Sequence, residues 1–203
     1  MFKTMRQFIV LLVAAFSLTA CQRPTNNSIS IKRGIKPVAD NEQAIIETDF
    51  GDITMELYSN LAPLMVERFK QLAKEGFYDG TTFHRIDPNL GIIQGGDPLS
   101  KDSDPANDGT GGSNYPDVPQ EFSDVPYDAG TIGAARSNSP DSANCQFFIT
   151  LKRQSGFDER YTIFGRVVSG LNNAQVISTA PTEAGTARPL NPIVIKRITM
   201  KQK

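Results

Sequence analysis

Short runs in which apolar and polar residues alternate dominate this chain and favour β-strands. Between residues 53 and 57, three apolar side chains alternate with Thr54 and Glu56, which is the pattern of a strand with one buried face. Comparable runs predict seven further strands, at residues 44–48, 82–86, 91–94, 131–135, 146–151, 161–168 and 193–200. The pattern therefore predicts a β-rich domain.

Two other stretches have the spacing of helices. Residues 63–76 begin with a proline, which suits a first helical turn, then carry an apolar stripe and end at a glycine. Ser169 is expected to cap a second, shorter helix in which Leu171, Ala174 and Ile177 share a face. Eight strands can close into a compact barrel with one helix for each open end, although periodicity by itself leaves barrel and sandwich open.

The first residues have the layout of a bacterial export signal. Lys3 and Arg6 form a basic start, and residues 8–16 form an apolar run that is too short to span a bilayer. The run leads to Leu-Thr-Ala-Cys, which resembles a lipobox, so Cys21 is expected to be lipidated; a secretory leader with a chance cysteine is the alternative. By resemblance to Gram-negative lipoproteins, Gln22 indicates the outer membrane. We therefore expect a cell-envelope protein anchored by lipid and facing the periplasm.

The chain accordingly divides into three parts. We expect a signal peptide over residues 1–20, a lipidated cysteine and flexible tether over residues 21–43, and one folded domain over residues 44–203. The formal net charge is −1, and removal of Lys3 and Arg6 gives −1 − 2 = −3 for the mature chain. This mildly acidic balance gives no electrostatic reason to expect nucleic acid as a partner.

The few cysteines and histidines limit the possible chemistry. If Cys21 is acylated, Cys145 has no partner for an intramolecular disulfide, and we expect it to be a small residue packed beside a strand. His84 is the one histidine of the chain, which excludes most histidine-built metal sites, so no metal is expected. His84 itself fits a packed side chain better than a proton carrier.

Several linked sequence blocks carry a family resemblance. Residues 77–86 read FYDGTTFHRI, residues 93–97 read IQGGD, residues 130–137 read GTIGAARS and residues 144–149 read NCQFFI. These look like the F-H-R, Q-G-G-D and S-Q-F-F-I blocks of the cyclophilin family, in the family's order and separation. The resemblance runs from about residue 44 to residue 200, and linked blocks are far more specific than one short pattern.

This resemblance implies a fold and an activity. The fold is a mainly β, closed eight-stranded antiparallel barrel capped by two α-helices, and the activity is cis/trans isomerisation of X–Pro bonds without a cofactor. The resemblance gives Arg85 the role of the catalytic arginine and Gln94 that of the partner of the substrate carbonyl. The substrate-binding residues that it implies are Leu90, Ile92, Ser137, Phe148, Phe157 and Tyr161.

The residue types suit the chemistry of a prolyl amide. Its partial double bond gives a rotation barrier of roughly 18–20 kcal/mol, so uncatalysed exchange is slow. A cationic donor aimed at the nitrogen lone pair stabilises the twisted state more than the planar ones, and an always-charged, rigid Arg85 fits that task. The purely structural alternatives are a surface ion pair for Arg85 and a core position for Ile92.

The chain also departs from the family pattern. Arg85 and Gln94 are one residue further apart than is usual, and Gly91 stands where an aromatic residue is normal, with Leu90 as its nearest substitute. The chain has no tryptophan, so we expect weak cyclosporin binding. We expect a monomer that acts on proline-containing polypeptides and assists the folding of exported proteins. The alternative is a proline-segment binding module or chaperone with little turnover, which the altered wall at residues 90–91 favours.

Overall fold

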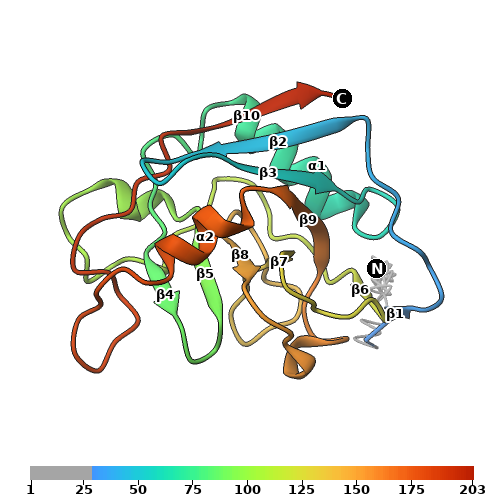
Figure 1. Cartoon of the computed structure of the whole chain (residues 1–203). Helices are drawn as coiled ribbons and strands as arrows, with labels where there is room; N and C mark the ends of the chain where they lie inside the picture. Colours follow the sequence, from blue (N-terminus) through green and yellow to red (C-terminus); the bar gives the residue numbers. More distant parts are fainter. Residues whose placement is uncertain (1–28) are drawn as a thin grey trace, which may run out of the picture.

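The computed structural model describes residues 29–203, so the expected signal peptide and the lipidation of Cys21 lie outside the described residues. An antiparallel sheet in the order β10-β2-β3-β9-β7-β8-β5-β4 forms the body of the domain (Figure 1). Its strands are β2 Glu42–Glu47, β3 Ile53–Leu57, β4 Arg85–Asp87, β5 Ile92–Gly95, β7 Thr131–Ala134, β8 Phe147–Thr150, β9 Ile163–Ser169 and β10 Arg197–Gln202. Each of the eight strands predicted from the alternation is present.

Isoleucines on the concave face of the sheet explain why it curls around a core. Paired residues of neighbouring antiparallel strands point to the same face, and the register aligns Ile86 of β4, Ile93 of β5, Ile149 of β8 and Ile132 of β7. All four side chains are fully buried in the main hydrophobic cluster. Cys145 is buried in the same cluster, which confirms the prediction that it is a packed residue.

The two edges of the sheet meet through the segments that lead into the edge strands. The peptide N–H groups of Gly80 and Phe83 donate to the carbonyls of Ile195 and Ile193, and the N–H of Ile195 donates to Thr81. These antiparallel bonds connect the chain before β4 with the chain before β10, although β4 and β10 themselves do not form a ladder. The predicted mainly β fold with an eight-stranded antiparallel sheet is therefore confirmed, and where a closed barrel was expected the sheet curls into a half-barrel with β4 and β10 as its edge strands.

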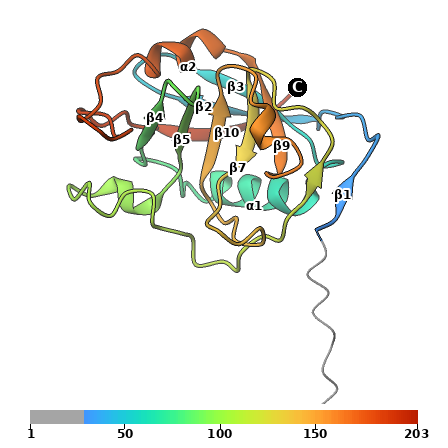
Figure 2. The ribbon, with the colours of Figure 1, turned by 90° about the horizontal axis from the view of Figure 1, so that it is seen from below.

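Two helices lie at opposite ends of the curled sheet, as Figure 2 shows. Helix α1 (Pro63–Lys74) begins at its proline as predicted, and α2 spans Leu171–Ile177; two 3₁₀ turns occupy Pro98–Lys101 and Ser155–Phe157. The expected cap at Ser169 is wrong, because Ser169 ends β9 and Gly170 precedes the helix with a φ of 81° that favours glycine. None of the helices within residues 29–203 has the length and apolarity that a bilayer crossing requires.

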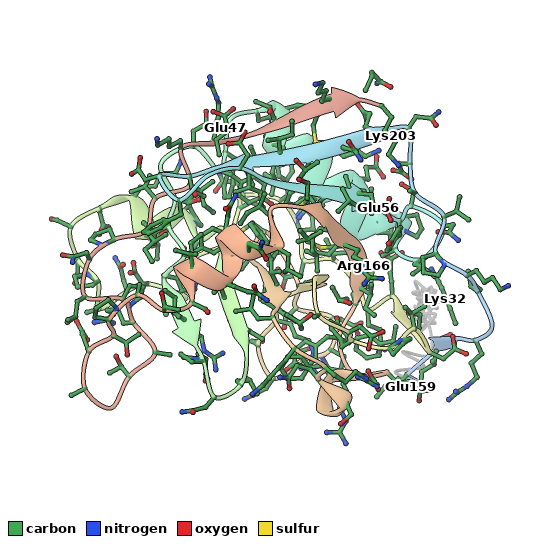
Figure 3. All side chains as sticks on the ribbon, in the orientation of Figure 1. Lys32, Glu47, Glu56, Glu159, Arg166 and Lys203 are labelled. Carbon is green, nitrogen blue, oxygen red and sulfur yellow. The ribbon has the colours of Figure 1, made fainter. Side chains whose placement is uncertain are left out.

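The beginning of the described chain differs from the expected flexible tether. Strand β1 (Ile31–Lys32) pairs in parallel with β6 (Phe122–Ser123). The Lys32 ammonium donates to the carbonyl of Leu61 at 2.6 Å, and the Arg33 guanidinium forms an ion pair with Glu159 at 2.6 Å. Figure 3 labels Lys32 and Glu159 on this side of the molecule. Residues 31–33 are thus held against the domain by contacts with residues between 29 and 126 positions away in sequence, which local polarity does not reveal.

Candidate active site

The catalytic candidates form a row across the outer face of the sheet. The register places Arg85 of β4 opposite Gln94 of β5, Gln94 opposite Phe148 of β8, and Phe148 opposite Gly133 of β7. These residues share one face because paired residues of antiparallel strands do so, and each is one position away from a residue of the isoleucine row. The Cα atoms of Arg85 and Phe148 are therefore about 10 Å apart, which is twice the spacing between neighbouring strands.

Phe148 belongs to a second hydrophobic cluster, the outer aromatic cluster. Phe148 packs edge-to-face on Phe157 and Tyr161, with ring centroids 5.4 and 5.6 Å apart, and stacks on Tyr127 at 5.8 Å. Edge-to-face and offset arrangements are the favourable ones for aromatic rings. The cluster consists of Tyr58, Leu61, Ile92, Tyr127, Phe148 and Ile163, with partly buried neighbours that include Ala39, Leu90, Val125, Ala135, Phe157 and Tyr161.

Five of the six substrate-binding candidates therefore come together in this one cluster. Ile92 is 2% exposed and belongs to this cluster rather than to the main core, and its substrate-binding role stays a prediction. Phe148 is only 3% exposed, so the partly exposed members Leu90, Phe157 and Tyr161 form the part of the cluster that a ligand can reach.

A glycine makes room for the stacked rings. A Cβ atom at Gly133 would lie 2.3 Å from Cζ of Phe148 and 2.6 Å from the hydroxyl of Tyr127. Both distances are shorter than contacts that a Cβ atom makes in proteins, and both rings are buried and stacked on each other in the cluster. Gly133 is thus a condition for the position of Phe148.

Arg85 is well placed to meet a ligand. Its side chain is 42% exposed, and its Nη1 lies 3.5 Å from Oε1 of Gln94. Its Nη2 lies 3.3 Å from a carboxylate oxygen of Asp87, so the arginine also has a partly exposed ion-pair partner on its own strand. The long distance indicates a weak interaction that leaves the guanidinium able to turn toward a bound peptide.

Gln146 is a site residue that the sequence reading did not select. Its Oε1 accepts from Nε2 of Gln94 at 3.1 Å, and its own Nε2 donates to the carbonyls of Gly109 and Gly111. Its position two residues before Phe148 was the available signal, because alternate residues of an extended segment share a face. Together with residues 109–112, Gln94 and Gln146 line a hollow of about 310 Å³ beside the row.

Ser137 lies apart from the outer aromatic cluster and lines this hollow instead. Its backbone was expected to pair with a substrate chain, but its N–H donates to the hydroxyl of Ser142 at 3.0 Å and its carbonyl accepts from Arg136. Both groups therefore already have partners within the protein. The neighbouring Arg136 also stacks its guanidinium over Tyr161, 4.5 Å from the ring centroid.

The departure at residues 90–91 has a structural reason. The N–H of Gly91 donates to the carbonyl of Asp87 at 2.6 Å and closes the turn between β4 and β5, with a φ of 69°. A left-handed residue at the end of this longer turn favours glycine over an aromatic residue. Leu90 packs against the outer aromatic cluster, and its role as a substitute wall of the substrate pocket stays a prediction.

The titratable residues around the row do not resemble an acid–base pair. Burial lowers the pKa of His84, partly offset by the charge of Asp97, so the imidazole is neutral at pH 7. Burial raises the pKa of the Cys145 thiol to about 12, which makes it a poor nucleophile. Within residues 29–203, no group of three or more His, Cys, Asp or Glu side chains is arranged to hold a metal ion.

The curled sheet, the two helices and an external row of arginine, glutamine and phenylalanine define a barrel protein with a cyclophilin-like fold and an outward-facing site. The chain belongs to the cyclophilin-type peptidyl-prolyl cis-trans isomerase family, whose model matches residues 44–200. It is accordingly a peptidyl-prolyl cis-trans isomerase.

Relatives and solved structures agree with this family. A probable peptidyl-prolyl cis-trans isomerase of Brucella suis is 42% identical over 168 residues, covering 80% of this chain and 85% of the relative. A peptidyl-prolyl cis-trans isomerase of Schizosaccharomyces pombe is 37% identical, covering 76% of this chain and 97% of that protein. A Cryptosporidium parvum cyclophilin crystallised in the presence of the dipeptide Ala-Pro superposes with a TM-score of 0.71 at 28% identity, covering 79% of this chain and 99% of that one.

Proposed function

We propose that Arg85, Gln94 and the outer aromatic cluster form the catalytic site and that the substrates are exported or envelope polypeptides. The prolyl ring packs against the accessible edge of the cluster at Phe157 and Tyr161. The free hydrogen of the Gln94 amide donates to the carbonyl of the substrate, since its other hydrogen is bonded to Gln146.

In this arrangement, Arg85 supplies the transition-state stabilisation. As the amide twists, the imide nitrogen becomes pyramidal and its lone pair accepts from the guanidinium. The planar ground states offer no such lone pair, so the interaction lowers the barrier selectively. The observation that carries the proposal is the register that sets Arg85, Gln94 and Phe148 side by side on the outer face.

An exchange assay on an Ala-Pro peptide, followed by NMR, tests the proposed role of Arg85. Replacement of Arg85 by Ala is expected to lower kcat/KM about 10²–10³-fold, as for the loss of one preorganised donor. Arg85→Lys is the matched control: it keeps the charge but loses the rigid fork, and should fall between the two. Equal activity in wild type and Arg85→Ala would contradict the mechanism, while retained peptide affinity without faster exchange in the wild type would favour the binding-module alternative.

The proposed location rests on the export signal and Cys21. Seven residues lie between Cys21 and Ile29, the first described residue, so the two are eight Cα–Cα steps apart and can be separated by at most about 29 Å. A lipid at Cys21 would therefore keep the isomerase close to the membrane, where unfolded exported chains emerge. Palmitate labelling of the wild type against Cys21→Ser tests this: an unlabelled wild-type protein contradicts the anchor without affecting the isomerase assignment.

Cyclosporin affinity and oligomeric state are secondary parts of the proposal. The residue next to Phe157 is Gly156, which faces open space at the position of a Cβ and itself supplies no indole-like partner. We therefore propose weak cyclosporin binding, and separately we propose that the protein is a monomer. Calorimetry that gives nanomolar-class affinity, or light scattering that gives a dimer mass, would contradict each point in turn.

A further inference from the structure

A buried carboxylate lies directly behind the proposed catalytic row. Asp97 follows β5 by two residues and is fully buried. Its Oδ1 accepts from the N–H of Leu99 at 2.8 Å, and its Oδ2 accepts from the N–H groups of Gly109 and Gly111. Hydrogen bonds from backbone N–H groups to an ionised acceptor are among the stronger ones in proteins. The carboxylate thus holds the loop at residues 109–111 in place.

The fit between this loop and the carboxylate is tight. A Cβ atom at Gly111 would lie 2.1 Å from Oδ1 of Asp97 and 2.8 Å from Cγ of Leu99. No side chain at position 111 is compatible with the carboxylate in its observed place. Sequence and geometry are therefore matched so that the backbone of residues 109–111 rests directly on Asp97.

The carbonyls of the same loop determine how the Gln146 amide is oriented. Nε2 of Gln146 donates to the carbonyl of Gly109 at 3.1 Å and to that of Gly111 at 2.9 Å, so both of its hydrogens are used. The reverse orientation would set its oxygen against two carbonyl oxygens. Oε1 of Gln146 must therefore face Gln94, where it accepts from Nε2 at 3.1 Å.

This constraint passes on to the catalytic row. Because Nε2 of Gln94 donates to Gln146, its Oε1 faces the guanidinium of Arg85, and one amide hydrogen stays available for a substrate carbonyl. We propose that Asp97 is a positioning residue: through the backbone of residues 109–111 and Gln146, it sets the orientation of the Gln94 amide beside Arg85. The inference rests on the proposed roles of Arg85 and Gln94.

Replacement of Asp97 by Asn tests the relay with minimal change of shape. An asparagine side chain cannot accept from Gly109 and Gly111 with one atom and from Leu99 with the other, because one of its two polar atoms is a donor. The loop should shift and release Gln146. We expect kcat to fall between about 10- and 100-fold, as for a small displacement of a catalytic group, while the apparent KM stays close to wild type because the outer aromatic cluster is untouched.

A double-mutant cycle separates this role from general destabilisation. If Asp97 acts through Gln146, then Asp97→Asn combined with Gln146→Ala should be no worse than the more damaging single change. The matched control is Glu121→Gln, which alters another buried carboxylate that accepts from backbone N–H groups, those of Leu64 and Met65 at the start of α1. This control should lower the free energy of unfolding, leave kcat unchanged and show additive effects when it is combined with Gln146→Ala.

Two further measurements keep the test decisive. The side-chain amide NMR signals of Gln94 and Gln146 should shift in Asp97→Asn and stay in place in Glu121→Gln. If Asp97→Asn does not fold, Gln146→Glu is the substitute test. It removes the donor to the carbonyls of Gly109 and Gly111 while Asp97 still holds the loop, and it should lower kcat by a similar factor.

The relay is refuted if kcat changes less than twofold in the variants that fold, or if the effects of Asp97→Asn and Gln146→Ala simply multiply. If Arg85→Ala is inactive in the same experiments, such a result refutes only the role of Asp97 and leaves the catalytic role of Arg85 standing. Full activity of Arg85→Ala refutes the catalytic assignment instead, whatever Asp97→Asn does.

Discussion

The two faces of strand β8 use the same residue type for different purposes. Phe147 points inward, is fully buried and touches Phe69, Tyr78 and Phe83 at centroid distances between 5.7 and 6.2 Å. Phe148 points outward and is 3% exposed, so the exposed fractions are nearly equal. Burial therefore does not distinguish the core phenylalanine from the one that we propose to bind substrate.

The neighbours in the register do distinguish them. Inward-facing Phe147 aligns with Gly95 and Ala134, and it belongs to the main cluster together with the aligned isoleucines of four strands. Outward, Phe148 aligns with Gln94 and Arg85, next to a hollow that polar side chains line. A buried aromatic residue becomes a candidate for binding when its row across the sheet ends in exposed polar groups.

The largest effect is expected from truncation on the inner face. Phe147→Ala should lower the free energy of unfolding by about 3–5 kcal/mol, because it leaves a cavity inside a ring of aromatic contacts. Denaturant unfolding followed by circular dichroism measures the change. A loss below about 1 kcal/mol would show that the inner face repacks easily and would remove the contrast between the two faces.

The same truncation on the outer face should affect activity more than folding. Phe148→Ala removes a ring contact worth about 1.5–3 kcal/mol, which corresponds to roughly a 10- to 100-fold loss in kcat/KM. Since Phe148 still lies in a packed cluster, some stability is lost as well. Phe148→Leu is the control that keeps apolar volume: it should restore most stability and only part of the activity. Full activity of Phe148→Ala would separate the outer aromatic cluster from substrate binding.

Two adjacent residues extend the comparison to charge. Arg85 faces outward with its charge exposed, whereas burial lowers the pKa of His84 and keeps it neutral. Because the folded pKa lies below the ordinary value of 6.5, this group contributes stability that is complete above pH 6.5 and is lost as the pH falls through the folded pKa. Denaturant midpoints of wild type and His84→Gln, measured from about pH 7.5 down to pH 5, should converge on the acid side. Parallel curves would contradict a buried neutral histidine.

The smallest effect is expected where the N-terminal segment meets the outer face. Arg33 forms an ion pair with Glu159, which lies two residues from both Phe157 and Tyr161 and holds a φ of 57°. Arg33→Glu should loosen this loop and slightly lower kcat/KM, because exposed ion pairs contribute little. The charge-swapped pair Arg33→Glu with Glu159→Arg should recover the loss. If the charge-swapped pair does not recover the loss, the segment is attached to the domain without supporting the site.

Much of the site was readable once the family blocks were recognised. The residues to which the resemblance gave substrate-binding roles, apart from Ser137, lie in one cluster: Leu90, Ile92, Phe148, Phe157 and Tyr161. Ser137 does not, since its backbone groups are used within its own loop. Gln146 was missed although it shares the face of Phe148, because its importance lies in contacts with a loop some 35 residues earlier.

The sequence by itself determined the strands, the two helices and the identity of the catalytic candidates. These follow from alternation and helical spacing, which are local properties of neighbouring residues, and from linked motifs. The tertiary structure alone decided that residues 31–33 bind the domain, that Gly133 makes room for Phe148, and that Asp97 supports Gln94 through Gln146. Those relations join residues far apart in the chain, and no local period encodes which distant backbone groups a buried carboxylate or amide will meet.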